Sequence, residues 1–316
     1  MHAPQPLVRL ERSSLVESIH HGSVAVADDE GNLYASAGDP ERVVFARSTS
    51  KPLQAAVSLA SIGEDLPDPE VAVMSASHNG ESIHVETVER ILARAGLDPA
   101  ALRCPPGLPL DPESARVAAE PLPVLHNCSG KHAGMLLACV RGGLDPASYL
   151  DAAHPLQGAV LEAVTAAAGR APVAIGVDGC GVPVHALPLA SLATLYARLP
   201  RSAARPVAAM TAAPYLAAGR GRLCTAAMEA IPGLVVKNGA EGIMCASLTG
   251  SGLGVAVKVE DGAMRAAEAA LVRTLALLEA VPPEAEEALA PFLAPPVLGG
   301  GRPVGRLVAE FGLVSA

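Results

Sequence analysis

The sequence predicts an α+β fold in which both ends of the chain form one antiparallel sheet and a helical block lies between them. Residues 1–46 alternate between apolar and polar side chains, as half-buried strands do. Residues 47–230 are mainly helical in pattern, and strand patterns return from residue 231 before a closing helix. This order favours a sheet shared by the two chain ends. We therefore expect a single domain over residues 1–316, with a sheet-forming part at 1–46 and 231–316 and a mainly helical part at 47–230.

Each element of this fold follows from a local pattern. The first strands are predicted by LVRLER, SLVESIHHG and GSVAVADDEGNLYASAGD, and Glu30, Gly31 and Asn32 predict a hairpin turn. Helices are predicted by SIHVETVERILARAGLD, YLDAAHPLQGAVLEAVTAAAG and RAAEAALVRTLALLEA, and APVAIGVDGCGVPVHALPL predicts a buried strand that leads into a loop. Strands return in GLVVKNGAEGIMCASLTGSGLGVAVKVEDGAM. We expect the tail VPPEAEEALAPFLAPPVLGGGRPVG to be a solvated surface segment with a glycine turn at residues 299–301.

The composition limits the function classes. Half of the 316 residues are hydrophobic and 17% are charged, which is typical of a folded globular protein. A net charge of -9 argues against nucleic acid as a partner, and the 2% aromatic content leaves few side chains on which bases could stack. No apolar run approaches the length of about 20 residues that a membrane helix needs, and no signal peptide is recognisable. We expect a soluble cytoplasmic protein with no membrane partner, whose six cysteines form no disulfides.

A serine and a lysine stand three residues apart where the first helix is predicted to begin. Pro52 fits only the first turn of a helix, so Ser48 should lie at or next to the N-cap and share a helix face with Lys51. Lys51 can take the serine proton only when neutral, which requires its pKa to fall by roughly three units, or about 4 kcal/mol. Amides at the helix start can stabilise the oxyanion formed when Ser48 attacks a carbonyl. The alternative is a capping serine beside a solvated lysine.

Lysine is scarce in this chain, and the positions of its lysines favour a functional role over simple exposure to solvent. Its four copies are Lys51, Lys131, Lys237 and Lys258, and three of them lie in stretches rich in Gly, Ser or Asn. Lys237 ends an apolar run in VVKNGAEG, which resembles the K-T-G strand that lies beside the S-x-x-K helix in penicillin-recognising serine hydrolases. A third polar wall is expected from SASHNGES, which contains Ser75, Ser77, His78 and Asn79.

Cysteines, histidines and a lysine gather in two further stretches. HNCSGKHAGML contains Cys128, Lys131 and His132, and GVDGCGVP adds Asp178 and Cys180 between glycines. These ligand types suit a zinc ion, although the paired C-x-x-C spacing of a structural zinc site is missing. Alternatively, the two cysteines are buried or reactive thiols, or they have no functional role. The remaining cysteines, Cys104, Cys139, Cys224 and Cys245, lie in apolar or helical stretches and are expected in the core.

Six motifs in order, RSTSKP, SASHNGE, HNCSGKHAGML, GVDGCGVPVHALPL, GRGRLCT and KNGAEG, give the chain its family resemblance. It resembles the L-asparaginase II family typified by the inducible, thermolabile Rhizobium enzyme, whose fold is similar to the serine β-lactamases and penicillin-binding proteins. The resemblance covers nearly the whole length. It implies that Ser48 is the nucleophile with Lys51 as its base, and that Ser77 and Lys237 form a second serine–lysine pair. It also implies a homodimer.

The resemblance further implies a metal and a set of substrate contacts. One Zn²⁺ per chain would be held by Cys128, Lys131 and Cys180, and Lys131 would need a strongly lowered pKa to act as a ligand. The ion would aid substrate binding more than it activates water. Substrate contacts are expected from Arg47, His78, Asn79, His132 and Asp178, the last two near the metal. Leu223 in GRGRLCT stands where a family tyrosine is expected, and HNGES has a polar pattern of its own, so both could alter specificity.

The expected reaction is hydrolysis of L-asparagine to L-aspartate and ammonia through an acyl-enzyme on Ser48. Glutamine is one methylene longer, a difference worth only about 1 to 3 kcal/mol in a pocket, so weak glutaminase activity is compatible with this site. Two alternatives stand beside it. One is another amidase, an esterase or a penicillin-recognising hydrolase on the same fold, and the other is a non-catalytic protein that binds an amino acid or zinc.

Overall fold

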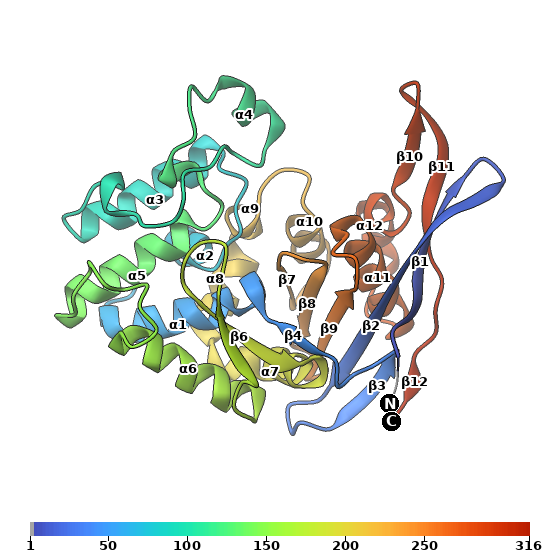
Figure 1. Cartoon of the computed structure of the whole chain (residues 1–316), viewed down its shortest axis with the longest axis horizontal. Helices are drawn as coiled ribbons and strands as arrows, with labels where there is room; N and C mark the ends of the chain where they lie inside the picture. The colour runs from blue at the N-terminus through green and yellow to red at the C-terminus, as the bar shows by residue number, and fades with distance from the viewer. Residues whose placement is uncertain (1–2) are drawn as a thin grey trace.

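A nine-stranded antiparallel sheet forms one side of the molecule in the computed structural model, which describes residues 3–316 (Figure 1). The strand order is β10-β11-β1-β2-β9-β8-β7, and β3 pairs with both β2 and β12. The strands are β1 (Gln5–Arg12), β2 (Leu15–Ala27), β3 (Leu33–Ala37), β7 (Leu234–Asn238), β8 (Ile243–Leu248), β9 (Leu253–Val259), β10 (Pro296–Gly299), β11 (Arg302–Ala309) and β12 (Val314–Ser315). The two ends of the chain therefore build one sheet, as predicted.

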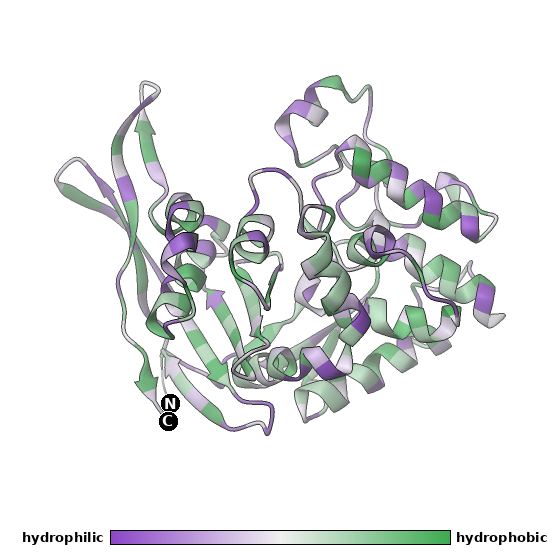
Figure 2. Cartoon of the chain, turned by 180° about the vertical axis from the view of Figure 1, so that it is seen from behind, coloured by the Kyte–Doolittle hydropathy of each residue, from purple (hydrophilic) through white to green (hydrophobic). Residues whose placement is uncertain are grey.

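The central contact of this sheet joins the N-terminal strands to the C-terminal ones. The first half of β2 pairs with β1, and its second half lies between β3 and β9, with Val24 opposite Val257. The predicted hairpin turn between β2 and β3 is confirmed, because Asp28 N donates to Asn32 O at 3.0 Å and Gly31 has a φ of 99°. Hydrophobic residues run along these strands (Figure 2).

The helical block fills the other side of the molecule. Its helices are α1 (Lys51–Ile62), α2 (Asp68–Met74), α3 (Ser82–Arg94), α4 (Pro112–Val117), α5 (Ser129–Gly142), α6 (Pro155–Ala168), α7 (Leu189–Ser202), α8 (Ala204–Ala212), α9 (Pro214–Ala217) and α10 (Leu223–Ala230). Helices α11 (Met264–Leu277) and α12 (Glu286–Leu293) follow the sheet strands. Within residues 3–316, no helix is long and apolar enough to cross a membrane.

Two apolar clusters hold these layers together. One combines the sheet with α7 and α11, and the other gathers α1, α2, α3 and α5. Helix α7 comes very close to β9, since a Cβ on Gly254 would lie 2.0 Å from the carbonyl oxygen of Ala193. Any side chain larger than hydrogen at position 254 would force the helix away from the sheet. The polar side chains predicted to act in chemistry are buried where α1 and α5 approach strand β7.

The structure differs from the sequence predictions in two elements. The segment predicted as one buried strand is a hairpin of an exposed β5 (Ala174–Val177) and a buried β6 (Pro183–Pro188), which joins β4 (Val43–Phe45) in a small sheet. The C-terminal tail lies at the surface, as predicted, but it is regular, because it contains α12 and the β10–β11 hairpin. Strand β11 continues past the tail and pairs with β1, with a buried Leu307 opposite Leu10, so cross-strand pairing outweighs the Pro- and Gly-rich composition. The glycine turn is confirmed at residues 299–301.

Candidate active site

Ser48 lies in a tight turn just before α1. The turn is a 3₁₀ helix over Arg47–Ser50, and α1 itself begins at Lys51, so the N-cap of α1 is Ser50 and not Ser48. Arg47 holds a φ of 49°, which is unfavourable for any residue with a Cβ and is typical of functional sites. Ser48 is 9% exposed, and its hydroxyl makes no hydrogen bond to Lys51 within the described chain. Ser48 is therefore nearly buried, and its hydroxyl has no hydrogen-bond partner among the described residues.

Lys51 points into the interior and not into solvent. Its Nζ lies 2.6 Å from the carbonyl oxygen of Ala76, 3.1 Å from Ser77 Oγ and 3.3 Å from the carbonyl oxygen of Asn127. The residue is only 1% exposed. The alternative of a solvated lysine is therefore wrong. The packing of α1 against α5 and the loop after α2 places this amine at the centre of the site.

Lys237 approaches the same serine from the sheet. It lies near the end of β7, and its Nζ is 2.7 Å from Ser77 Oγ, 2.8 Å from Asn238 O and 3.0 Å from Asn238 Oδ1. Burial holds the pKa of Lys237 well below its usual range, and the nearby charge of Lys51 lowers it further. The predicted pairing of Ser77 with Lys237 is present, and Ser77 also bridges to Lys51.

Counting donors and acceptors assigns the protons in this network. A serine hydroxyl has one proton, so Ser77 can donate to one lysine only and must accept from the other. Lys51 faces three acceptors, which matches the three protons of an ammonium group. A neutral Lys237 has two protons for the oxygens of Asn238 and a lone pair for the proton of Ser77. Both amines face three oxygens, so the count alone fits either one as the neutral partner. The burial that lowers the pKa of Lys237 favours the neutral form there, with Ser77 donating to Lys237 and accepting from Lys51.

His78 and Asn79 are buried and hydrogen-bonded within the protein, and their predicted contact with substrate stays a prediction. His78 Nδ1 accepts from Gly80 N at 3.1 Å, and its Nε2 lies 3.0 Å from Ser129 Oγ. Burial first, and then neighbouring His84, hold the pKa of His78 well below its usual range. Asn79 Nδ2 donates to Glu81 Oε1 at 3.2 Å and Arg220 O at 3.0 Å. Both side chains therefore fix the loop that carries Ser77.

Glu81 organises this loop, and sequence analysis missed it. Its carboxylate accepts from Asn79, from the backbone N of Arg220 at 3.0 Å and from the hydroxyl of Tyr215. These contacts tie the loop after α2 to the segment between α9 and α10. Glu81 stands in the HNGES stretch, but nothing in the sequence indicates a partner more than 130 positions away. Leu223, the other departure from the family pattern, is buried at the start of α10 and presents no polar group.

Arg47 and Asp178 form an ion pair that connects the serine turn to the cysteine cluster. Arg47 Nε donates to Asp178 Oδ1 at 2.7 Å, and Gly179 N donates to the same oxygen at 2.9 Å. Burial opposes the charge on Asp178, but the hydrogen bond from Arg47 and the charge of Lys131 hold its pKa below the usual range. Asp178 Oδ2 lies 3.6 Å from Cys180 Sγ. The pair presents one positive and one negative group beside Ser48.

The three predicted metal ligands lie together. Lys131 Nζ is 2.8 Å from Cys180 Sγ, and Cys128 and Cys180 share a hydrogen bond. That hydrogen bond lowers the pKa of Cys128 well below its usual range, and the start of α5 further favours a thiolate there. Within residues 3–316 no group of three His, Cys, Asp or Glu side chains could hold a metal ion, so a three-ligand set needs Lys131.

His132 lies beside this cluster in an arrangement that suits a supporting role. Tyr149 Oη accepts from Arg103 N at 3.1 Å and lies 2.6 Å from His132 Nδ1, so the tyrosine proton goes to Nδ1 and Nε2 carries the N–H. That Nε2 is buried with no oxygen or nitrogen partner in the described part of the chain, next to Cys180. Burial, with a smaller effect of Lys131, lowers the pKa of His132 to about 4. An N–H directed at Cys180 Sγ would orient that sulfur if it served as a metal ligand.

The lowered pKa predicted for Lys131 applies to the amine as a zinc ligand and stays a prediction. Among the protein's own groups, burial opposes the charged form of Lys131, but the adjacent Cys180 and Cys128 sulfurs together raise its pKa above the usual range. A bound zinc ion would therefore have to displace a proton from this amine. Two thiols and one amine still fit zinc in ligand type, and metal binding to such a set releases protons.

A family model described as L-asparaginase II matches residues 8–309. The chain is similar in structure to a β-lactamase from Mycobacterium bovis, at a TM-score of 0.40 and 18% identity, covering 86% of this chain and 95% of that one. It is also similar to a Bacillus glutaminase, at a TM-score of 0.45 and 13% identity over 82% and 91% of the two chains. For the protein Mglu the values are 0.39 and 16%, over 82% and 67%. TM-scores this low carry no argument about activity. No curated protein matches the sequence.

Proposed function

The chain belongs to the L-asparaginase II family, and from that premise we propose that it hydrolyses L-asparagine to L-aspartate and ammonia through a serine acyl-enzyme. The observation that carries the mechanism is the position of Ser77 Oγ between Lys51 Nζ, at 3.1 Å, and Lys237 Nζ, at 2.7 Å. A hydroxyl held between two buried amines can pass a proton from one to the other. Such a relay can remove a proton from a charged lysine, which must be neutral before it can act as a base.

Ser48 is the proposed nucleophile. Its hydroxyl is the more exposed of the two candidate serines, at 9% against 1% for Ser77, and it is free of internal partners among the described residues. A proton moving from Lys51 to Ser77, as Ser77 passes its own to Lys237, leaves Lys51 neutral. Rotation about the Cε–Nζ bond can then present the lone pair of Lys51 to Ser48. Ser48 Oγ adds to the side-chain amide carbon, and its proton passes to Lys51.

The same groups complete the reaction. The tetrahedral adduct expels the amide nitrogen, which takes a proton from the lysine network and leaves as ammonia. Water then attacks the ester on Ser48, gives its proton to the network, and releases aspartate with Ser48 restored. Each proton that the lysines take up is returned within the same half of the reaction, from Ser48 to the leaving nitrogen in acylation and from water to Ser48 in deacylation. Ser77 therefore acts as a relay, and its removal should slow both halves.

Arg47 and Asp178 are proposed to bind the amino-acid end of the substrate. Asparagine carries a carboxylate and an ammonium group on the same carbon, and this ion pair offers one group of each complementary sign beside Ser48. The positive φ of Arg47 sets the direction of the backbone that leads into Ser48, and in this conformation the Arg47 side chain reaches Asp178. The pair thus has a positioning effect on the nucleophile as well as a charge for the substrate.

Zinc is proposed as the cofactor. Cys128, Lys131 and Cys180 would hold it, with His132 and Asp178 beside them. A zinc ion there supplies a positive centre that strengthens binding of the substrate's polar groups. Its expected contribution is to substrate affinity, because the proton transfers described above need only the serines and lysines.

Ammonia release from L-asparagine by the purified protein tests this function. L-Glutamine, a chromogenic ester and a β-lactam assayed in parallel cover the other hydrolases. Turnover of asparagine that exceeds that of glutamine, with no turnover of the ester or the β-lactam, supports the proposal. Hydrolysis of the ester or β-lactam without ammonia release from asparagine would replace it with the first alternative. A protein that binds asparagine and releases no ammonia would be the non-catalytic relative.

A further inference from the structure

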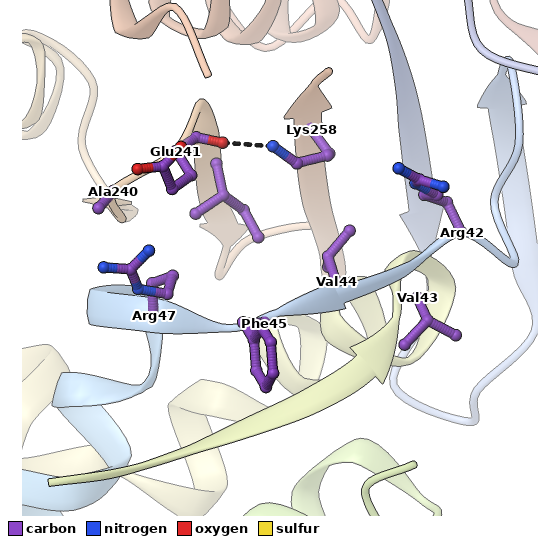
Figure 3. Close-up of a pocket in the computed structure, with 9 residues that line it drawn as sticks. Arg42, Val43, Val44, Phe45, Arg47, Ala240, Glu241 and Lys258 are labelled. Atoms are coloured by element: carbon purple, nitrogen blue, oxygen red, sulfur yellow. Dashed lines mark hydrogen bonds between the residues drawn. The ribbon is translucent and has the colours of Figure 1, made fainter. Parts of the chain in front are cut away.

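A cavity of about 230 Å³ lies between β4 and the turn that joins β7 to β8 (Figure 3). Its floor is apolar and is made by Val44 and Ile243, both buried. Arg42, Arg47 and Lys258 surround it on the same side of β4 as Val44, whereas Val43 and Phe45 point to the other side (Figure 3). The lining residues thus include three cations and one carboxylate, Glu241. The proposed reaction uses none of them except Arg47.

Lys258 reaches this cavity without a direct ion pair, although the carboxylates of Glu260, Glu241 and Asp261 lie near enough to favour its charged form. Its Nζ donates to the backbone oxygens of Glu241 and Val259, the latter at 2.8 Å. Among residues 3–316, no carboxylate oxygen lies within 4.0 Å of it. The ammonium has three protons, so one remains for a ligand. A half-buried cation that contacts only carbonyl oxygens is a group that an anion would stabilise.

The two arginines also retain unused donors. Arg47 uses Nε for Asp178, and neither of its terminal nitrogens has a partner in the described part of the chain. Arg42 uses one terminal nitrogen for Glu260 at 2.7 Å. The terminal N–H groups of the Arg47 guanidinium can therefore donate to both oxygens of a carboxylate while Nε stays bonded to Asp178. Binding at this place need not break the ion pair beside Ser48.

We propose that this cavity binds a small organic carboxylate between Arg42, Arg47 and Lys258, as a site separate from the one that holds the scissile amide. The volume corresponds to roughly eight water molecules at about 30 Å³ each, which limits the ligand to a few carbon atoms. The apolar floor favours a short carbon stem over a bare inorganic anion. Since Arg47 precedes Ser48, an occupied cavity lies directly beside the candidate nucleophile.

Calorimetric titration of the purified protein with malonate tests the proposal, because malonate has no amide to hydrolyse. Saturable binding is expected, with at least a tenfold weaker affinity in both Lys258→Met and Arg42→Gln. Arg116→Gln, on the exposed side of α4, is the control and should bind as the wild type does. Chloride at equal ionic strength should not compete, which separates carboxylate binding from general charge screening.

The active-site lysines offer another place for an anion, and one variant distinguishes it. Lys237→Met should leave malonate affinity unchanged. If Lys237→Met weakens binding while Lys258→Met and Arg42→Gln do not, the anion binds at the serine–lysine network and the proposal is overturned. Absence of saturable malonate binding to the wild type overturns it as well. Thermal melts of each variant show that it is folded, and the binding assay stands whether or not asparagine is hydrolysed.

Discussion

Replacement of Lys237 with methionine should make the folded protein more stable and remove its activity. Lys237 is fully buried, and its pKa is held well below its usual range by burial and by Lys51. If the amine is neutral in the folded protein at pH 7, folding must remove a proton from a group whose pKa in an unfolded chain is about 10.4. At about 1.36 kcal/mol per unit, this costs about 4.6 kcal/mol.

Methionine keeps most of the volume of lysine and removes that cost. It also removes three hydrogen bonds, to Ser77 and to two oxygens of Asn238, which contribute about 1 kcal/mol each. The free energy of unfolding at pH 7 should therefore rise by about 1 to 2 kcal/mol in Lys237→Met. Asparagine turnover should fall by roughly 10³-fold or more, because the relay through Ser77 loses its acceptor.

The pH dependence makes the test sharper. With a lowered pKa in the folded state, Lys237 binds fewer protons folded than unfolded between that pKa and about 10.4, so wild-type stability rises with pH across this window. The neutralisation cost falls from about 4.6 kcal/mol at pH 7 to about 1.9 kcal/mol at pH 9. Urea unfolding at both pH values should show that the stability difference between variant and wild type falls by about 2.7 kcal/mol, so that the variant, more stable at pH 7, is about 1 kcal/mol less stable than the wild type at pH 9.

Lys258→Met is the matched control for this experiment. Lys258 is only half-buried and its pKa is lowered less completely, so the stability difference should change less with pH. A Lys237→Met stability difference that is the same at pH 7 and pH 9 would mean that the folded protein holds Lys237 as an ammonium group. The proton assignment for Ser77 would then be wrong.

Three further predictions concern the reaction and the metal. Ser48→Ala should reduce asparagine turnover by roughly 10³-fold or more, measured by ammonia release, whereas Ser58→Ala, inside the α1 helix that follows the serine turn, should stay within a few-fold of wild type. Retention of a tenth of the activity in Ser48→Ala would exclude Ser48 as the nucleophile. Elemental analysis after expression with zinc should give close to one zinc per chain, lost in Cys180→Ser and kept in Cys139→Ser. Absence of zinc from the wild type would mean that Cys128 and Cys180 are ordinary thiols and not metal ligands. The kcat/KM for asparagine should rise with pH and stay high in mild alkali, because burial and Lys51 lower the pKa of Lys237 and the reaction needs a neutral lysine; a rate that falls above about pH 7 would exclude a lysine base.

The order of elements was predictable because periodicity records it locally. Alternation along residues 1–46 and 231–259 and helical repeats between them place the strands and helices without any knowledge of contacts. The errors lie where pairing decides the structure. The β10–β11 hairpin gains its stability from β1, almost 300 positions away, and its Pro- and Gly-rich sequence carries little strand pattern of its own.

The candidate site was predictable by residue type and not by partner. Scarcity of lysine and the serine spacing identified Lys51, Ser77 and Lys237, yet the sequence cannot show that both amines contact one hydroxyl. The family resemblance groups Lys131 with Cys180, but it does not give the direct contact of the amine with Cys180 Sγ or the raised pKa that the sulfurs produce against burial. Burial and long-range contacts set these properties, and neither is encoded in spacing. The homodimer expected from the resemblance stays a prediction.

The claim that Ser48 forms an acyl-enzyme is tested most directly by covalent labelling. The wild-type protein would be treated with an asparagine analogue whose amide is replaced by an electrophilic group, and the label located by mass spectrometry. Cleavage after glutamate separates the two serines, since Ser48 falls in residues 42–64 and Ser77 in residues 71–81. The account predicts one label per chain on Ser48, absent from Ser48→Ala. A label on Ser77 that persists in Ser48→Ala would contradict it, and would make the serine between the two lysines the nucleophile.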